Sequence, residues 1–389
     1  MTQTGLRVLM ISDVYFPRIN GVSTSIETFR HDLHHHGVAV TLVAPAYPHS
    51  GDTPDTHRVP SRRLPFDPED RLMHWDHLTR TTRELAARNF DVVHIQTPFA
   101  AHYAGVRAAR QLRLPVLATY HTHFEEYFHH YLPLLPRSWL RATARSIARG
   151  QCNALDAVVV PSHALRQTLS NYGVTVPLHV LSTGIPVAQF QHGDGVRFRR
   201  AHDLAPERPL ALFVGRVAHE KNIGFLLKAL AHLVRILPAA LLVIAGEGPA
   251  LPALQREAVA LGLENHIRFV GYLDRSTQLP DCYAAADVFV FASKTETQGL
   301  VLLEAMAAGL PVYALAEMGT KDILEPRCGA VVAPDDAAAF AAGLAALLGD
   351  RPRLTDMAAA ARSFADEWSG PERARRLAAL YRSLAEQRQ

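Results

Sequence analysis

Two basic residues share one short loop in the middle of the chain. The loop reads Gly-Arg-Val-Ala-His-Glu-Lys-Asn from Gly215 to Asn222, between an apolar run and a helical stretch. Arginine offers a fork of donors to phosphate oxygens and lysine a movable point charge, so such a pair at a helix start suits a diphosphate. We therefore expect Gly215, Arg216 and Lys221 to hold a phosphorylated ligand, although a solvated loop can carry two such charges by chance.

Two glutamates, seven residues apart, flank the start of a later helix. Glu304 falls in an apolar helical run, where a carboxylate requires polar partners, and the hydroxyls of a ribose are natural candidates. Glu296 precedes the helix start on the loop. The N–H groups of Gly299, Leu300 and Val301 are suited to bind phosphate oxygens without a metal. The alternative is structural, with Glu296 as a cap and Glu304 at the edge of the core.

Glycine precedes a helix in two other loops. Gly21 and Val22 open an apolar helix near the start of the chain, where glycine permits close approach of a ligand and the helix offers N–H groups to phosphate. A simple Asn-Gly turn explains this segment equally well. Gly246 begins a Gly-Glu-Gly-Pro loop for which a tight turn and ligand approach are both adequate explanations. The loop at Gly21 is not G-x-G-x-x-G, which argues against a dinucleotide dehydrogenase.

A segment rich in histidine and aromatic residues follows an expected strand of the first half, beginning Tyr-His-Thr-His-Phe-Glu-Glu at Tyr120. His-x-His beside two glutamates raises the question of a metal site. No clear ligand set emerges, and the diphosphate already has cations assigned to it. We favour His121 as a residue that hydrogen-bonds a transferred sugar, and we expect neither a metal site nor a cofactor.

The elements that position these loops alternate along the whole chain. Short runs rich in Val, Ile and Leu recur with helical stretches between them, which predicts parallel strands covered on both faces and a doubly wound α/β architecture in each half. The expected strands are Arg7–Ile11, Val38–Ala44, Asp91–Ile95, Pro115–Thr119, Ala157–Val160 and Leu178–Leu181, then Leu210–Val214, Ala240–Ala245, Ile267–Val270, Val288–Phe291, Val312–Leu315 and Ala330–Val332.

The alternation breaks near Ser182–Gln191, which predicts a domain of residues 1–187 and a second of residues 188–370. The final stretch, Pro371–Gln387, has the apolar spacing of a helix. Ligands of doubly wound sheets bind at the carboxyl ends of the strands. Two such sheets facing each other would therefore form a cleft lined by loops from both halves.

The composition is that of a globular protein, with 48% hydrophobic and 20% charged residues. No apolar run approaches the ~18 residues of a membrane span, and the start does not resemble a signal peptide. The three cysteines are widely spaced, so a cytoplasmic setting fits best. Residues 1–187 hold 18 Arg and 14 Asp or Glu, a net of +4, whereas the remainder holds 22 basic and 23 acidic residues, a net of −1. This asymmetry suggests an anionic surface near the first half, and we expect no nucleic-acid partner.

Taken together, these features resemble family 4 of the retaining glycosyltransferases over nearly the whole chain. The resemblance rests on Gly21, His121, Gly215 with Arg216 and Lys221, Gly246, and the E-x7-E spacing of Glu296 and Glu304. It implies the GT-B fold, in which two Rossmann-like domains bind a nucleotide diphosphate sugar and the last helix, residues 371–389, returns to the first domain. It also implies transfer without a divalent metal.

The resemblance implies a role for each matching residue. Arg216 and Lys221 would bind the diphosphate and compensate the charge of the leaving group. Glu304 would hold the ribose hydroxyls and Glu296 the hydroxyls of the donor sugar. His121 would contact the sugar near the reacting carbon.

On the same resemblance, Gly21 would close against the phosphates, with Val22 beside it. The base is expected near Val270-Gly271-Tyr272, where Val270 and Tyr272 frame a backbone that could read its edge. Retention without an obvious nucleophile suggests attack from the same face, with the leaving diphosphate taking the proton of the acceptor hydroxyl.

Two segments narrow the resemblance further, because Tyr120–Tyr127 and Thr295–Gly299 are similar to bacterial diacylglycerol glucosyltransferases. We therefore expect a hexose, with UDP-glucose favoured as donor, to pass to a lipid or glycolipid such as diacylglycerol. A GDP-mannose-dependent mannosyltransferase acting on a glycolipid or polysaccharide is the main alternative. A nucleotide-sugar 2-epimerase, a nicotinamide oxidoreductase and a non-catalytic sugar-nucleotide-binding protein are further alternatives.

An arginine recurs every fourth residue in one expected helix of the first half, at Arg137, Arg141, Arg145 and Arg149. Such a stripe would attract anionic lipid headgroups at ~1 kcal/mol per basic residue near the surface. A solvated face of an ordinary helix explains the stripe equally well. The sequence thus predicts a cytoplasmic protein that is either free or peripheral on the inner face of the cell membrane.

Overall fold

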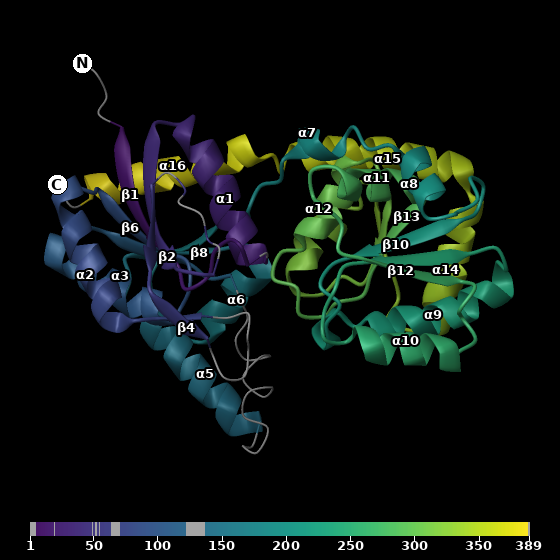
Figure 1. Cartoon of the computed structure of the whole chain (residues 1–389), viewed down its shortest axis with the longest axis horizontal. Helices are drawn as coiled ribbons and strands as arrows, with labels where there is room; N and C mark the ends of the chain where they lie inside the picture. The colour runs from purple at the N-terminus through teal and green to yellow at the C-terminus, as the bar shows by residue number, and fades with distance from the viewer. Residues whose placement is uncertain are drawn as a thin grey trace. The chain divides into compact units, whose positions relative to one another are not determined.

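The structure is a computed structural model that describes residues 5–18, 20–48, 50, 53, 55–63, 71–121 and 137–387, except for the side chains of 137–141. The chain divides into two compact units (Figure 1). Unit 1 comprises Met1–Gly184 and Gly370–Gln389, and unit 2 comprises Ile185–Ser369. These limits lie within three residues of the boundaries that the sequence pattern suggests.

Unit 1 is built on a seven-stranded parallel sheet with the order β3-β2-β1-β6-β7-β8-β9. Its strands are β1 Leu6–Ile11, β2 Val38–Pro45, β3 Thr56–Val59, β6 Val92–Ile95, β7 Val116–Thr119, β8 Ala157–Val160 and β9 Leu178–Val180. A separate antiparallel pair is formed by β4 Ser61–Arg63 and β5 Arg71–Met73.

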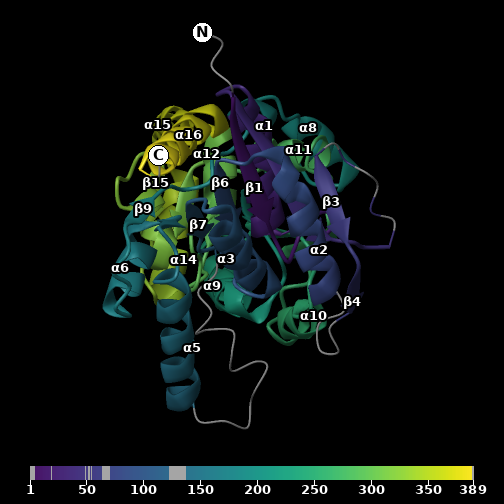
Figure 2. The same ribbon diagram turned by 90° about the vertical axis from the view of Figure 1, so that its left-hand side faces the viewer.

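Helices cover both faces of this sheet (Figure 2). They are α1 Gly21–His34, α2 Trp75–Leu85, α3 Ala100–Leu112, α5 Arg137–Cys152, α6 His163–Asn171 and α16 Gly370–Glu386, with a 3-10 turn at Ala86–Arg88. Alternate residues of β1 serve the two faces: Val8 and Met10 pack with α1 and α16, whereas Leu9 and Ile11 pack with α2 and α3. Such burial on both faces explains the unbroken apolar run of the strand.

Unit 2 is built on a six-stranded parallel sheet with the order β12-β11-β10-β13-β14-β15. Its strands are β10 Leu210–Val214, β11 Leu241–Ala245, β12 Ile267–Gly271, β13 Val288–Phe291, β14 Val312–Ala314 and β15 Ala330–Val332. Its helices are α7 Val187–Phe190, α8 Gly195–Ala201, α9 Ile223–Ile236, α10 Leu251–Ala260, α11 Gln278–Ala285, α12 Leu300–Ala307, α13 Lys321–Leu324, α14 Ala337–Gly349 and α15 Arg351–Asp366, with 3-10 turns at His219–Lys221 and Met318–Thr320.

The two doubly wound sheets agree with the fold that the sequence predicts, and the final helix does return to unit 1. Strands β3, β4 and β5 were not anticipated. They are short and partly exposed, and they carry polar residues such as His57, Arg62 and Arg71. Edge and hairpin strands of this kind lack the continuous apolar run on which the sequence analysis relied.

Candidate functional site

The loops with the candidate donor-binding residues follow β10 and β13, which are neighbours in the sheet of unit 2. From this central pair, β11 and β12 extend to one side and β14 and β15 to the other. The chain therefore leaves β10 and β13 in opposite directions at their carboxyl ends. Such a topological switch point is the place where open α/β sheets bind ligands.

Lys221 and Glu296 meet at this switch point. The Lys221 Nζ atom donates to Oε2 of Glu296 at 2.5 Å, and both side chains are 20% exposed. Lys221 ends the 3-10 turn after β10, and Glu296 lies on the loop between β13 and α12. The structure thus brings together two of the predicted residues from loops 75 positions apart.

Two further hydrogen bonds join these loops. The Asn222 side chain donates to the carbonyl of Ala292 at 3.1 Å, and the Ser293 hydroxyl donates to the carbonyl of Glu220 at 3.1 Å. Asn222 has a left-handed backbone with a φ of 54°, which turns the chain into α9. The loops after β10 and β13 therefore hold each other in place. Arg216 lies on the first of them and is exposed.

Glycine permits close backbone contact where β10, β11 and β12 end. The amide of Gly215 donates to Ala245 at 3.0 Å, and the amide of Gly246 donates to Gly271 at 2.7 Å. A Cβ atom on Gly246, whose φ is 133°, would lie only 2.0 Å from the carbonyl oxygen of Gly215. The protein's own packing therefore requires glycine at 246, which supports the tight-turn explanation of this loop.

The helix start at Gly299 has the form that an anion site would use. Gly299 has a φ of 89° and precedes α12, and as a glycine it has no side chain with which to cap the first turn. Leu300 and Val301, whose N–H groups were predicted to bind phosphate, are the first two residues of this helix and are half-buried. The N–H groups of a first helical turn have no partner within the helix, so they are available to an anionic ligand.

Gly319 packs against the loop that carries Glu296. This residue was not identified from the sequence. Its amide donates to the carbonyl of Glu296 at 2.9 Å, and a Cβ atom at this position would lie 1.9 Å from the carbonyl oxygen of Thr297. A larger residue would therefore displace the loop that carries Glu296. The Met-Gly-Thr sequence around Gly319 carries no pattern that could have revealed this contact.

Glu304 is 2% exposed and has two partners inside unit 2. Its Oε1 atom accepts from Nη2 of Arg275 at 2.5 Å, and its Oε2 atom accepts from the Tyr283 hydroxyl at 3.0 Å. The attraction of Glu304 raises the pKa of Arg275. The chain itself therefore supplies two of the polar partners that this carboxylate requires, an arginine and a tyrosine, in addition to the sugar hydroxyls that the sequence predicts. A carboxylate has about four acceptor positions, so capacity for a ribose remains.

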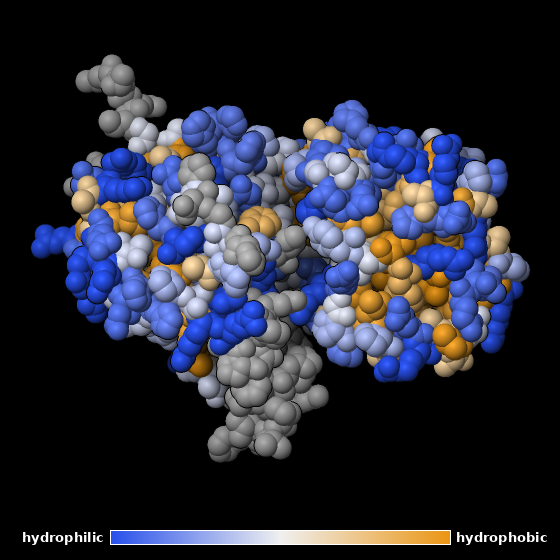
Figure 3. Space-filling model, viewed as in Figure 1, coloured by the Kyte–Doolittle hydropathy of each residue, from blue (hydrophilic) through white to orange (hydrophobic). Residues whose placement is uncertain are grey.

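The segment expected near the base lies at the end of β12, an edge strand of the sheet. Val270 is half-buried on this strand, and Tyr272, just beyond it, is 50% exposed. Figure 3 shows hydrophobic surface in the area of β12. Exposed apolar and aromatic groups suit the stacking of a planar ring, but no described contact assigns them to a base.

In unit 1, Gly21 begins α1 and Val22 follows it. The Asn20 side chain caps the helix by accepting from the amide of Ser23 at 2.8 Å, and Asn20 has an extended backbone. A Cβ atom on Gly21 would meet no atom within 4 Å. Asn-Gly therefore forms a helix cap here, and the packing of unit 1 does not by itself require glycine at 21.

His121 follows β7, and its Nε2 atom lies 2.9 Å from Oε1 of Gln96, which follows the neighbouring strand β6. Burial lowers the pKa of His121 to about 4, so the imidazole is neutral at neutral pH. With Nε2 donating to Gln96, the ring acts as a hydrogen-bonding group rather than a cation. Gln96 was not identified from the sequence, although its place at a strand end resembles that of His121.

His94, which precedes Gln96 on the chain, makes two further hydrogen bonds in the core of unit 1. His94 of β6 is fully buried, with Nδ1 2.6 Å from the Tyr381 hydroxyl and Nε2 2.8 Å from the Thr119 hydroxyl. Burial, with a smaller effect of His121, lowers the pKa of His94 to about 3. Both ring nitrogens of a neutral histidine are thereby satisfied, and α16 is joined to β6 and β7.

Asp13 occupies the switch point of the first sheet, between the ends of β1 and β6. Its carboxylate accepts from the Thr97 hydroxyl at 2.8 Å and from the amide of Ala101, at the start of α3, at 3.1 Å. Burial raises the pKa of Asp13 to about 6 although these donors favour the charged form. The residue fixes the start of α3 beside the loop that carries Gln96.

The row of arginines along α5 and the His-x-His segment after β7 are each described only in part. Arg145 and Arg149 of α5 are exposed, and the Arg145 guanidinium lies 5.4 Å from the ring centre of Tyr172. The side chains of Arg137 and Arg141 lie outside the described residues, as do the remaining members of the His-x-His segment. Among the residues that are described, no three His, Cys, Asp or Glu side chains gather as metal ligands. Throughout the described residues, no helix is long and apolar enough to cross a membrane.

Comparisons with known proteins agree on the class of protein. Residues 19–189 match the model of Glycosyltransferase Family 4, and residues 196–364 match that of Glycosyl transferases group 1. The chain is 32% identical over 319 residues to the alpha-monoglucosyldiacylglycerol synthase of Streptococcus pneumoniae, covering 79% of this chain and 71% of that protein. It is 29% identical over 341 residues to a GDP-mannose-dependent alpha-mannosyltransferase of Mycobacterium tuberculosis, covering 85% and 84%.

Solved structures show the same fold. Sucrose-phosphate synthase from Thermosynechococcus elongatus superposes with a TM-score of 0.79 at 20% identity, covering 98% of this chain and 100% of that one. Anabaena HepE in complex with UDP gives a TM-score of 0.77 at 17% identity, covering 97% and 100%. The chain therefore belongs to family 4 of the glycosyltransferases and has the GT-B fold.

Proposed function

We propose that the chain is a retaining hexosyltransferase that transfers a sugar from a nucleotide diphosphate, with UDP-glucose favoured, to a lipid or glycolipid acceptor such as diacylglycerol. One observation carries the donor side of this proposal. Lys221 and Glu296 are in contact at the switch point of a parallel sheet, which supports a site where the lysine binds phosphate and the carboxylate binds sugar hydroxyls. The acceptor is supported by the relative in Streptococcus pneumoniae, which is named for monoglucosyldiacylglycerol synthesis.

The proposed mechanism uses positioning and charge. Arg216 and Lys221 neutralise the diphosphate as it leaves, with help from the N–H groups at the start of α12. Glu304 holds the ribose, and Glu296 holds hydroxyls of the transferred sugar. The acceptor hydroxyl attacks the anomeric carbon from the face that the diphosphate leaves, and a diphosphate oxygen takes its proton. The configuration at that carbon is thereby retained.

Two further expectations concern the role of His121 and the need for a divalent cation. A neutral His121 hydrogen-bonds the transferred sugar and gives no net charge to the leaving group. Because Arg216 and Lys221 supply positive charge to the diphosphate, we propose that transfer needs no divalent cation. Activity that persists in excess EDTA would support this point, and loss that Mg²⁺ restores would refute it.

The decisive experiment measures donor binding and transfer separately. A panel of nucleotide sugars is scored by thermal stabilisation, and each binder is then tested for transfer to lipid extracts. Lys221→Ala and Arg216→Ala are expected to abolish transfer while the fold survives. Lys228→Ala is the matched control, because Lys228 is an exposed lysine of α9. Near-normal turnover in both site variants would refute the assignment of the diphosphate.

The alternatives make different products. A GDP-mannose-dependent enzyme would be stabilised by GDP-mannose and would transfer mannose. The similarity to the mannosyltransferase of Mycobacterium tuberculosis supports this alternative. A nucleotide-sugar 2-epimerase would release product from the donor without any acceptor. Product analysis with the donor alone and then with lipid added separates these activities.

A further inference from the structure

Two aromatic side chains are unusually exposed at the start of α3. Phe99, the residue before the helix, is 56% exposed, and Tyr103, one turn later, is 57% exposed. Residues four apart lie on the same side of a helix, so the two rings share one face. Phe99 follows the Gln96-Thr97 segment, in which Gln96 contacts His121. The exposed rings therefore begin three residues from a partner of the candidate sugar-binding histidine.

One flank of α5 extends this apolar surface. The Gln151 side chain donates to the carbonyl of Pro98 at 2.7 Å and lies 3.5 Å from the Tyr103 hydroxyl. Ile147, one turn before Gln151 on α5, is 43% exposed. The last turn of α5 therefore contacts the start of α3, and Figure 2 shows both helices toward the viewer. We call the surface formed by Phe99, Tyr103 and Ile147 the α3–α5 face.

The charged side chains that α3 and α5 themselves carry have one sign. Neither α3 nor α5 contains an aspartate or glutamate, whereas α3 contains two arginines and α5 contains four. Arg107 and Arg110 are exposed and follow Tyr103 along the same side of α3. A surface that combines exposed rings with the exposed Arg107 and Arg110 is complementary to an anionic, partly apolar partner.

The arginines of α3, rather than the stripe along α5, belong to this face. Arg145 lies over the ring of Tyr172, which follows α6. Helical geometry turns each residue by 100°, so Arg145 and Arg149 project from the flank of α5 opposite Ile147 and Gln151. A flat partner that contacts Ile147, Phe99 and Tyr103 would therefore meet Arg107 and Arg110 rather than Arg145.

We infer that the α3–α5 face binds the surface of a lipid bilayer that contains anionic lipids. Aromatic rings prefer the boundary between headgroups and acyl chains, and arginines pair with the headgroup phosphates. The inference rests on the proposed function, because a lipid acceptor must be taken from a bilayer and this face adjoins the segment that contacts His121. A bilayer is favoured over an acidic protein for the same reason.

Vesicle binding tests this inference without any need for catalysis. The full-length protein is mixed with phosphatidylcholine vesicles, with or without phosphatidylglycerol, and the bound fraction is measured by sedimentation at low and high salt. The wild type is expected to prefer vesicles that contain phosphatidylglycerol. Phe99→Ala combined with Tyr103→Ala is expected to weaken binding to them about tenfold or more, the effect of losing two interfacial anchors.

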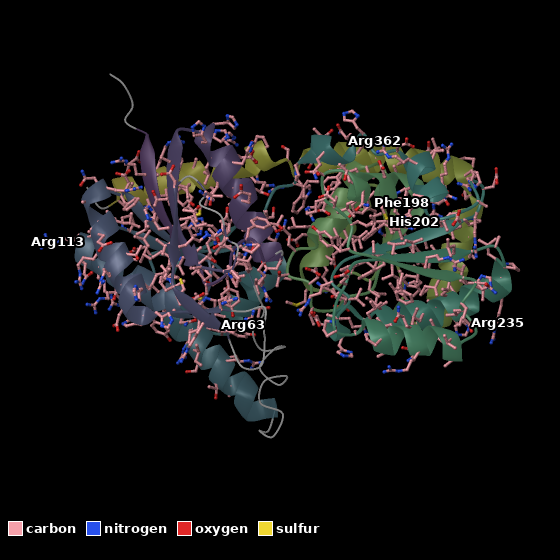
Figure 4. The ribbon with its side chains drawn as sticks, in the orientation of Figure 1. Arg63, Arg113, Phe198, His202, Arg235 and Arg362 are labelled. Atoms are coloured by element: carbon pink, nitrogen blue, oxygen red, sulfur yellow. The ribbon has the colours of Figure 1, made fainter. Side chains whose placement is uncertain are left out.

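The arginine variants report a different quantity. Arg107→Gln combined with Arg110→Gln is expected to remove most of the preference for phosphatidylglycerol and most of the salt dependence. Arg235→Gln is the control, because Arg235 is an exposed arginine of α9 in unit 2, labelled in Figure 4. Circular dichroism and urea unfolding verify that each variant is folded.

Three results would overturn the inference. The wild type fails to bind either kind of vesicle, or the aromatic double variant binds like the wild type. The third result is that Arg145→Gln combined with Arg149→Gln abolishes binding while the variants of α3 bind like the wild type. It would show that the opposite flank of α5 contacts the membrane. Failure of the proposed function has a separate signature, namely vesicle binding by a protein that transfers no sugar to any lipid.

Discussion

The hydroxyl of Tyr381 lies 2.6 Å from Nδ1 of His94, although the two residues are 287 positions apart in the chain. The bond joins the last helix to the strand that leads to Gln96. Both residues are fully buried, so water cannot replace either partner. The C-terminal helix is thereby connected to the strand ends that carry Gln96 and His121.

Tyr381→Phe should therefore destabilise unit 1. The change leaves a buried ring nitrogen of His94 without its partner, which costs about 1–3 kcal/mol. Urea unfolding followed by circular dichroism measures this loss. Tyr103→Phe is the control, because Tyr103 is 57% exposed and its hydroxyl can bond to water. An unfolding free energy equal to that of the wild type in Tyr381→Phe would contradict the prediction.

Arg275→Gln should weaken the binding of UDP by acting on Glu304. The change removes the cation beside a carboxylate that is 2% exposed. We expect a loss of roughly 2–4 kcal/mol in stability, below the full cost of breaking a buried pair because the Arg275 side chain is itself 32% exposed. Calorimetry is expected to show at least about a tenfold loss of UDP affinity.

The diphosphate of 2′,3′-dideoxyuridine distinguishes a positioning role of Arg275 from a structural one. If Glu304 binds the ribose hydroxyls, Arg275→Gln should change the affinity for this analogue much less than it changes the affinity for UDP. Equal losses for both nucleotides would show that Arg275 acts through the fold alone. Arg256→Gln, at an exposed position of α10, is the control and should bind both like the wild type.

Acid should destabilise the protein through its buried histidines. Burial lowers the pKa of His94 to about 3 and those of His102 and His121 to about 4, against 6.5 in the unfolded chain. The unfolded state therefore takes up protons below pH 6.5 that the folded state does not. Stability is full above pH 6.5 and falls as the pH decreases toward about 4, by up to about 1.4 kcal/mol per unit of lowered pKa.

Asp13 should oppose this trend. Its pKa is raised from 3.8 to about 6, so the folded state binds a proton first, and stability through this group rises as the pH falls from about 6 to 4. Asp13→Asn removes this contribution, and the stability of the variant should decrease more steeply with acid than that of the wild type. Urea unfolding at a series of pH values measures both slopes. A shallower slope in Asp13→Asn would show that the sign is wrong.

The sequence allowed the buried strands to be predicted because each one is a continuous apolar run. The pattern identified β8, β10 and β13 with the bounds that the structure has. It also located Lys221 and Glu296, because glycine, charge and helix start coincide at both loops. The roles of these residues in binding and transfer remain predictions that the proposed experiments test.

Contacts between distant segments could not be predicted in the same way. Arg275 is 29 residues before Glu304, in a loop whose polar sequence resembles an ordinary turn. Gly319 is significant only because the carbonyl of Thr297 lies where its Cβ would be. Such relationships depend on how the elements pack, and a periodicity along one element does not contain them.

The return of α16 to unit 1 has a consequence for synthesis on the ribosome. Leu377, Tyr381 and Leu384 complete the core on one face of the first sheet, beside Val8 and Met10. All of unit 2 is translated before these residues emerge. Unit 1 therefore cannot complete its core until the last helix is made, and part of its apolar face stays exposed to water until then. Nascent chains stalled before residue 370 should thus be sensitive to proteases in unit 1 while unit 2 is already resistant, and a ribosome-bound chaperone would find its exposed surface there.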